Sequence, residues 1–162
     1  MDGLSPQPLV NNPVFSHGTM DCRDAAKTQK WLTEFLGVHS VRKSEGTQYV
    51  WCGGRWFVAC LCVGEKVPPR QGEDYRFALA VGSEREVEDA HAAALAQREQ
   101  WEIREVRDMA RDGGKTSFNL RDLNGVWWEI YWHAGTDAAR GYEDAFRTVS
   151  TPFTTYFASK SG

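Results

Sequence analysis

The amino-acid sequence predicts an α+β fold in which two successive modules, each with the element order βαβββ, place curved mixed sheets around a cleft. Three observations support this prediction. Strand-like patterning precedes a helical pattern in each half of the 162 residues, glycine-containing turn signals divide the strands after each helix, and the whole order occurs twice. We expect one paired domain at residues 13–133, with modules at about 13–63 and 74–133, a lead at 1–12 and a C-terminal extension at 134–162.

The first module is expected to begin with a strand at residues 14–21, and Asp21 or Asp24 can cap the helix that follows. Apolar residues then recur with helical spacing up to Gly37, which predicts a helix that ends there, because glycine is typical of the end of a helix. Three short strands are expected after it, at about residues 38–43, 47–52 and 55–63.

The second module repeats this order. A strand at residues 75–81 leads into Ser83, which matches a capping box with Glu86 and starts a helix. One apolar face of this helix is expected to turn inward, formed by Val87, Ala90, Ala94 and Leu95. Three further strands are expected at about residues 102–106, 116–120 and 126–133.

The composition argues against two classes of partner. The 19 Lys and Arg residues against 22 Asp and Glu give a formal net charge of −3, so the chain lacks the basic excess that nucleic acid binding needs. No apolar run approaches the roughly 20 residues that span a bilayer, and the N-terminus has no signal-like apolar core. The cysteines lack zinc-type spacing and lie mostly among apolar residues, as reduced buried thiols do. We therefore expect a cytoplasmic protein.

Four local sequences carry a resemblance to a known superfamily. They are SHGTMDCRD at the start of the first module, FLG at the end of its helix, YRFALAV before the second helix and RDLNGVWWEIYW at the close of the second module. With these in order, the chain resembles the vicinal oxygen chelate superfamily, which includes glyoxalases, extradiol ring-cleavage dioxygenases, fosfomycin-resistance enzymes and bleomycin-binding proteins. The last match is the most telling, because the superfamily usually presents its final metal ligand on the strand after a D-x-x-G turn. The resemblance covers about residues 13–133 and implies a glyoxalase-like pair of modules.

The resemblance also implies metal-ligand positions on the first and last strand of each module. His17 and Glu129 match two of them, Arg76 stands where a histidine is usual, and Cys60 falls on the fourth. Arginine stays protonated and has no lone pair to offer a metal. His17 and Glu129 with a Cys60 thiolate would suit zinc or iron, whereas two ligands alone would make a weak site. The resemblance therefore implies either no cofactor or one divalent ion of iron, manganese or zinc.

The same residues support chemistry without a metal. Arg76 could clamp a carboxylate, phenolate or enolate by forked hydrogen bonds, and it could equally pair with Glu129 as a structural salt bridge. In the first case His17 is the expected proton carrier, since imidazole titrates near neutral pH, and Glu129 orients or ligates. The sequence leaves both interpretations open.

Aromatic residues suggest the kind of ligand. Strand alternation places aromatic side chains beside Glu129 on the last strand and beside His17 on the first. A cleft lined in this way would suit a planar, aromatic or conjugated molecule with an oxygenated or anionic group. The candidate substrate-binding residues are Phe15, Thr19, Trp51, Trp56, Cys60, Phe118, Trp127 and Tyr131.

We therefore expect a small-molecule enzyme of the vicinal oxygen chelate type that uses acid/base and electrophilic catalysis, as an isomerase, cyclase, lyase or decarboxylase does. Its catalytic residues would be His17, Arg76 and Glu129. A metal-dependent extradiol-type dioxygenase or glyoxalase-like lyase is one alternative, and a non-catalytic protein that sequesters a drug or metabolite is another. The expected partner is a small molecule, with no nucleic acid or membrane, and the resemblance permits a homodimer that completes the cleft.

Overall fold

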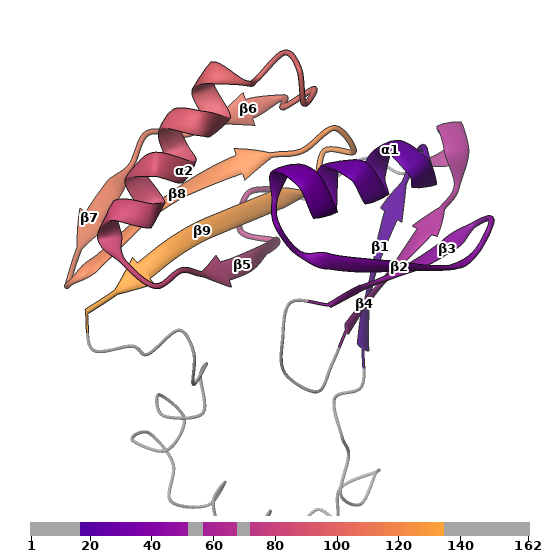
Figure 1. Cartoon of the computed structure of the whole chain (residues 1–162), viewed down its shortest axis with the longest axis horizontal. Coiled ribbons are helices and arrows are strands. Elements are labelled where there is room, and N and C mark those ends of the chain that lie inside the picture. The colour runs from indigo at the N-terminus through magenta and orange to yellow at the C-terminus, as the bar shows by residue number, and fades with distance from the viewer. Residues whose placement is uncertain (1–16, 52–56, 68–71, 135–162) are drawn as a thin grey trace, which may run out of the picture.

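Both modules are present, and in each a helix packs on one face of a sheet (Figure 1). The computed structural model describes residues 17–51, 57–67 and 72–134 of the chain. Within these residues, no helix is both long enough and apolar enough to cross a membrane.

The first module contains a four-stranded sheet in the order β1-β4-β3-β2, with β1 parallel to β4 and the other pairs antiparallel. Its elements are β1 His17–Cys22, α1 Ala25–Lys30, the π-helical segment η1 Trp31–Phe35, β2 His39–Ser44, β3 Thr47–Trp51, β4 Phe57–Cys62 and the 3-10 helix η2 Gly64–Lys66. The predicted helix and four strands are confirmed here. Residues 14–16, 52 and 55–56 of the predicted strands lie outside the described residues.

The start and end of the first helical segment follow from two side chains. Asp24 is the N-cap of α1, because its carboxylate accepts a hydrogen bond from the backbone N–H of Lys27 at 2.9 Å, whereas Asp21 lies within β1. After η1 the chain reaches Gly37, which has φ of +74°. A left-handed conformation of this kind costs glycine little, so the helical segment ends there as expected.

The second module contains a sheet in the order β5-β9-β8-β6, in which β5 is parallel to β9 and β7 pairs with the outer part of β8. Its elements are β5 Arg76–Ala80, α2 Glu84–Ala96, β6 Glu105–Val106, β7 Ala110–Asp112, β8 Lys115–Arg121 and β9 Trp127–His133. The predicted order of one strand, one helix and three later strands is confirmed, and β7 is added to it.

Two details predicted for this module are wrong, and one strand was not predicted. The strand expected at residues 102–106 is reduced to the two residues of β6, because Glu102 has φ of +51° and interrupts the extended backbone. The unpredicted β7 has three exposed residues without strand alternation, and it forms because a turn through Gly113 and Gly114 folds it back on β8. Leu95 is 52% exposed, because it follows Val87 by eight residues and lies off the buried face of α2.

The capping box predicted at the start of α2 is present. The Ser83 hydroxyl accepts a hydrogen bond from the backbone N–H of Glu86 at 3.2 Å. The Glu86 carboxylate in turn accepts a hydrogen bond from the backbone N–H of Gly82 at 3.0 Å. Both contacts satisfy backbone N–H groups that have no partner inside the helix, so the start of α2 is set by local sequence.

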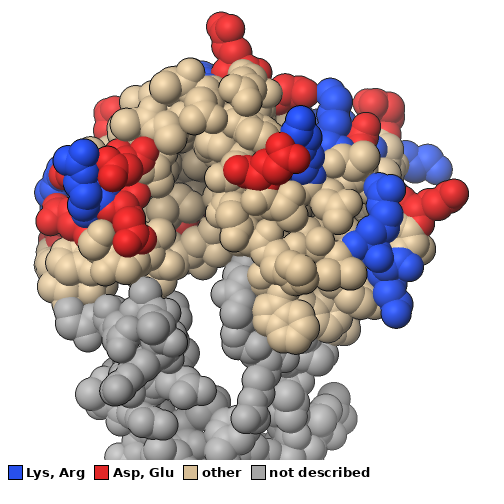
Figure 2. Space-filling model, viewed as in Figure 1, with Lys and Arg blue, Asp and Glu red and all other residues tan. Residues whose placement is uncertain are grey.

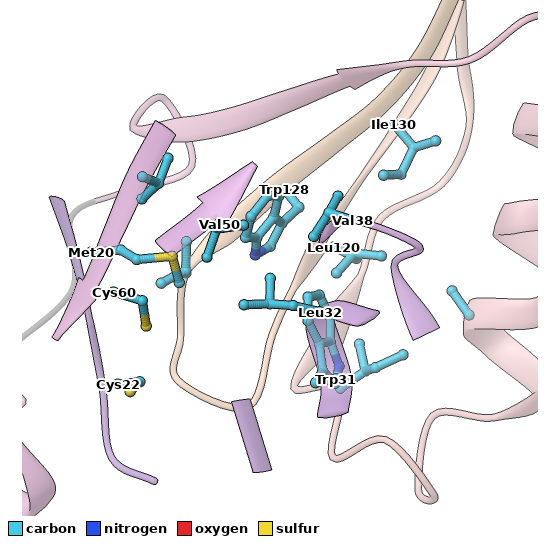
Figure 3. Close-up of a cluster of buried hydrophobic side chains, with 14 of the residues drawn as sticks. Met20, Cys22, Trp31, Leu32, Val38, Val50, Cys60, Leu120, Trp128 and Ile130 are labelled. Atoms are coloured by element: carbon cyan, nitrogen blue, oxygen red, sulfur yellow. The ribbon is translucent and has the colours of Figure 1, made fainter. Parts of the chain in front are cut away.

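One hydrophobic core joins the two modules. Figure 3 shows Trp31 and Leu32 of η1 together with Leu120 of β8 and Trp128 of β9 in a single buried cluster. The rings of Trp31 and Trp128 lie 6.0 Å apart. The helical segment of the first module therefore packs against the second module as well as against its own sheet.

The turn between β8 and β9 is organised by a fully buried carboxylate. Asp122 Oδ1 accepts hydrogen bonds from the backbone N–H groups of Asn124 and Val126, each at 2.8 Å, and Oδ2 accepts one from the indole N–H of Trp128 at 3.1 Å. Gly125 completes the turn with φ of +83°. This is the D-x-x-G turn of the sequence, and its aspartate fixes the start of β9.

The same turn binds the first module. The amide of Asn124 donates a hydrogen bond to the Thr28 hydroxyl at 3.0 Å and accepts one from the backbone N–H of Arg23 at 3.0 Å. Asn124 and Thr28 are both buried. These polar contacts fix how α1 sits against the β8–β9 turn, because buried polar groups need their partners.

Candidate functional site

The charged candidates of the second module lie on the face of its sheet opposite α2, which we call the polar face. It is formed by Arg76 of β5, Lys115, Asn119 and Arg121 of β8, and Trp127, Glu129 and Tyr131 of β9. The alternate residues Phe118, Trp128 and Ile130 belong to the buried cluster beneath α2. Strand alternation therefore separates the polar face from the hydrophobic core by one layer of backbone.

Glu129 is the centre of the polar face. Its side chain is only 9% exposed, and each carboxylate oxygen binds one cation. Arg76 Nε lies 3.1 Å from Oε2, and Lys115 Nζ lies 2.5 Å from Oε1. The two cationic side chains are themselves 31% and 37% exposed, so solvent or a ligand can reach them.

The electrostatics of Glu129 favour its charged form. Burial raises the pKa of the carboxyl group, but the hydrogen bonds and charges of Lys115 and Arg76 outweigh burial and hold the pKa below its ordinary value. Glu129 is therefore a carboxylate at neutral pH. In this arrangement it orients cations and is poorly suited to donate a proton.

Aromatic rings lie beneath the cations of the polar face. Lys115 Nζ is 5.0 Å from the ring centre of Tyr131, and the guanidinium groups of Arg107 and Arg121 are 5.2 and 5.8 Å from Trp127. Tyr131 and Trp127 are only 4% and 5% exposed. They support and position the cations by cation–π contact, and they offer little free ring surface to a ligand.

A second carboxylate continues this network. Glu73 accepts hydrogen bonds from the Asn119 amide at 2.6 Å and from Arg107 Nε at 3.0 Å. The Asn119 hydrogen bond, together with the hydrogen bond and charge of Arg107, lowers the pKa of Glu73 against the opposing effect of burial. Arg76 also donates to the backbone carbonyl of Glu73 at 3.4 Å. The side chains around Glu129 are thus held by neighbours on both sides, which favours a fixed geometry.

His17 lies in the other module. It is exposed at the start of β1, beside Phe57 of β4, and the two rings stack with centres 5.3 Å apart. Thr19 lies two residues further along the same strand face and is also exposed. The structure thus joins Arg76 to Glu129 directly, and the ring contact that it gives His17 lies within the first module.

Cys60 does not share the strand face of His17. In the β1–β4 ladder Met20 is the partner of Cys60, so Cys60 points to the α1 side of the sheet with Met20 and Cys22 (Figure 3). It is fully buried, and the Gln48 amide donates a hydrogen bond to its sulfur at 3.5 Å. The expected ligand position was displaced by one residue along β4, and a shift of one residue reverses the face of a strand.

Two predicted substrate-binding residues line a different space. Trp51 and Phe118 border a cavity of about 500 Å³ between the modules, where the segment from η1 to β2 faces α2 and β9. The rest of its lining is almost entirely apolar, including Leu79 and Ile130. Phe118 and Ile130 point to the α2 side of the second sheet, so this cavity and the polar face are separated by that sheet. Phe15 and Trp56 lie outside the described residues.

Charged side chains elsewhere are engaged in surface ion pairs. Arg111 of β7 binds Glu84 and Glu88 of α2 at 2.9 and 2.7 Å, and Arg85 binds Asp89 at 3.0 Å. Figure 2 shows such charged groups separated by broad uncharged surface. The two Arg111 pairs attach the β7 hairpin to α2, the Arg85 pair lies within α2, and we assign none of them a part in the site.

Comparison with known proteins identifies the architecture. No family model matches the sequence, and no curated protein matches it. Solved structures do match: FosX, a fosfomycin resistance protein from Listeria monocytogenes, has a TM-score of 0.57 at 18% identity over 76% of this chain and 95% of its own. A glyoxalase/bleomycin resistance protein/dioxygenase from Nocardioides has a TM-score of 0.56 at 16% identity over 79% and 89%.

The chain has the glyoxalase fold. A lactoylglutathione lyase from Agrobacterium tumefaciens is also similar, with a TM-score of 0.51 at 19% identity over 76% of this chain and 95% of its own. At these identities the likeness establishes the glyoxalase fold and leaves the chemistry to be argued from the residues of this chain. It confirms the α+β architecture of paired modules that the sequence predicts.

The residues of this chain do not fit the metal site that the glyoxalase fold implies. Both oxygens of Glu129 are bound by cationic nitrogens, Arg76 replaces one ligand, and Cys60 faces the core. Among the described residues, no group of three or more His, Cys, Asp or Glu side chains is arranged to hold a metal ion. We therefore derive no chemistry from a metal.

Lys115 is the principal residue that the sequence reasoning missed. The strand was expected to begin at residue 116, and the observed β8 begins at Lys115. Alternation over Lys115–Arg121 places Lys115, Asn119 and Arg121 on the face of Glu129, opposite Phe118 and Leu120. If the predicted strand had begun at residue 115, its alternation would have placed Lys115 on the same face as Glu129.

Proposed function

We propose that this protein binds and chemically transforms a small oxygenated organic anion at the polar face of the second sheet. The observation that carries the proposal is the buried carboxylate of Glu129 holding Arg76 and Lys115 in place while leaving both cations partly exposed. A pair of cations oriented by one carboxylate, with Lys115 also over the buried Tyr131 ring, is suited to an oxyanion, since little reorganisation is needed when the charge arrives or develops.

Arg76 is the proposed anion clamp. It uses Nε for Glu129 and makes one long contact, at 3.4 Å, with the Glu73 carbonyl. Guanidinium carries five N–H donors in a plane, so donors are left for a carboxylate, phenolate or enolate. Its planar group also suits an aromatic or conjugated ligand, which can stack on it. Substrates of this class would gain or lose a proton while Arg76 holds the oxyanion.

His17 is the proposed proton carrier, and its position sets a condition on the mechanism. It is exposed on β1 in the first module, whereas the anion clamp lies in the second. Its action on a bound anion therefore requires the β1 face to meet the polar face. We propose that a homodimer supplies this meeting, with the β1 face of one copy turned to the polar face of the other.

Non-catalytic sequestration of an anionic drug or metabolite is the second candidate function. It is favoured by the engagement of both Glu129 oxygens, because a carboxylate held in two ion pairs serves binding more readily than proton transfer. The two functions differ in the fate of the ligand, which sequestration leaves chemically unchanged.

The test uses a panel of aromatic and conjugated carboxylates, phenols and enolisable keto acids, incubated with purified protein and analysed by mass spectrometry and chiral chromatography. Conversion that requires His17 and Arg76 supports the enzyme, and in that case His17→Ala should lower kcat with little change in KM, while Arg76→Ala should raise KM and lower kcat. Tight binding with full recovery of unchanged ligand supports sequestration. No binding across the panel would overturn both.

A further inference from the structure

We infer that Lys115 permanently occupies, at Glu129, the place where the glyoxalase fold would put a divalent cation, and that the polar face is thereby specific for a monoanion. The inference rests on the proposed function, which it deepens by naming the charge class of the ligand and the residue that sets it.

The first step concerns the carboxylate. In the resemblance to the superfamily, Glu129 stands at the final ligand position, yet its Oε1 is bound by Lys115 Nζ and its Oε2 by Arg76 Nε. A metal at Oε1 would have to displace an ammonium group and lie beside a guanidinium, and both steps oppose its binding electrostatically. The carboxylate is therefore committed to protein cations.

The second step concerns how firmly Lys115 is held. Its ammonium group binds Glu129, lies 5.0 Å from the ring centre of Tyr131, and is 37% exposed. Tyr131 and Glu129 both lie on β9, so one strand fixes the ammonium from two directions. Lys115 thus presents a single positive charge at a defined point, which is the role that an electrophilic metal ion fills elsewhere.

The third step concerns the balance of charge. The polar face carries the carboxylate of Glu129 and the cations Arg76, Arg121 and Lys115, and beside it Arg107 forms ion pairs with Glu73 and Glu105. Within the described part of the chain Arg121 has no carboxylate partner, and its Nε donates to the Gly125 carbonyl at 3.3 Å. One positive charge is therefore in excess, and a ligand with one negative charge neutralises the face without a metal.

The experiment measures metal and anion binding separately in the full chain. Mn²⁺ is titrated with detection of the free ion by electron paramagnetic resonance, and Zn²⁺ by calorimetry. Calorimetry is then repeated with 1-naphthoate and with its uncharged analogue 1-naphthamide. The variants are Lys115→Ala, Lys115→Arg and Glu129→Gln. Lys66→Ala serves as the matched control, because Lys66 is exposed on η2.

We expect no stoichiometric binding of either metal to the wild type, and 1-naphthoate binding at least tenfold tighter than that of 1-naphthamide. Lys115→Ala should weaken the binding of 1-naphthoate at least tenfold, and Lys115→Arg should retain most of the wild-type affinity. Lys66→Ala should leave the affinity unchanged. Glu129→Gln should increase the affinity for 1-naphthoate, because it removes a negative charge next to both cations. Circular dichroism of each variant confirms folding, and the Arg variant keeps the test valid if the Ala variant fails to fold.

The outcomes separate the inference from the proposed function. Stoichiometric Mn²⁺ or Zn²⁺ binding that Glu129→Gln abolishes overturns the inference, while tight 1-naphthoate binding in the same protein leaves the proposed function standing. Tight 1-naphthoate binding that is indifferent to both Lys115 variants also overturns the inference alone. Failure of the wild type to prefer 1-naphthoate over 1-naphthamide overturns the anion site and the inference with it.

Discussion

Asp122 and Trp128 are joined by a hydrogen bond from the indole N–H to the buried carboxylate, 3.1 Å long, across the turn that precedes β9. The bond connects the loop that fixes the position of Glu129 to the ring that packs against Trp31 of the other module. The polar face and the contact between modules therefore depend on the same carboxylate.

Replacing this carboxylate should be among the most damaging changes in the chain. Asp122→Ala removes three acceptor contacts and leaves two backbone N–H groups and one indole N–H without their partner. We expect a loss of about 3–5 kcal/mol in the free energy of unfolding, measured by urea denaturation. Asp108→Ala, at an exposed position, is the control. Equal stability of the two variants would contradict the role given to Asp122.

The two indoles of the core offer a matched comparison. The N–H of Trp128 binds Asp122, whereas the buried N–H of Trp31 has no hydrogen-bond partner in the described structure. Trp128→Phe should therefore cost about 1–3 kcal/mol more free energy of unfolding than Trp31→Phe in urea denaturation, because only the former removes a hydrogen bond to a buried carboxylate. A larger loss for Trp31→Phe would show that packing outweighs the hydrogen bond.

Gly125 is required by its backbone conformation. Its φ of +83° lies in a region that other residues adopt at a cost, so Gly125→Ala should lower the free energy of unfolding by about 1–2 kcal/mol. Gly72→Ala is the control, because the added methyl group at Gly72 meets open space and its φ lies outside the left-handed region. Thermal unfolding of the two variants measures the difference in stability. A Gly125→Ala variant as stable as the control would contradict the requirement for glycine at this position.

The Glu129 ion pairs should make stability depend on pH in a defined direction. The folded-state pKa of Glu129 is lowered, so its contribution is fully present above the ordinary value of 4.5 and is lost as pH falls below 4.5 through the lowered pKa. Glu129→Gln should therefore destabilise the protein at pH 7, by about 1 kcal/mol or more, and the difference from wild type should shrink at pH 3. Urea denaturation at both pH values measures it.

Glu45→Gln is the control for this pH experiment, because Glu45 is exposed in the β2–β3 turn. The free energy of unfolding of Glu45→Gln should differ little from that of the wild type at both pH values. A Glu129→Gln difference that stays constant between pH 7 and pH 3 would show that the ion pairs do not stabilise the folded state.

The order of the elements could be predicted from the sequence because strand and helix patterns depend on local spacing. The caps at Asp24 and Ser83 and the stop at Gly37 are determined within a few residues, and all three are seen. These features need no knowledge of distant contacts. The pairing of Arg76 with Glu129 was expected as one of two alternatives from the superfamily resemblance, and in the parallel ladder Arg76 lies opposite Trp127, two positions before Glu129 on the same face.

The side chains that depend on exact strand register were harder to predict. Cys60 was assigned to the wrong face because β4 was shifted by one residue, and Lys115 was missed because β8 begins one residue earlier than expected. How β1 and the polar face are placed relative to each other depends on contacts between residues about one hundred positions apart, such as Asn124 with Arg23. Local patterns carry no information about such contacts.

The contact between Trp31 and Trp128 has a consequence for how this repeat unfolds. Each half of the duplication contributes an indole that packs in part against the other half, so neither half should persist alone once the other has melted. Heating should therefore give a single cooperative transition for both halves, in contrast to arrays whose repeats melt independently.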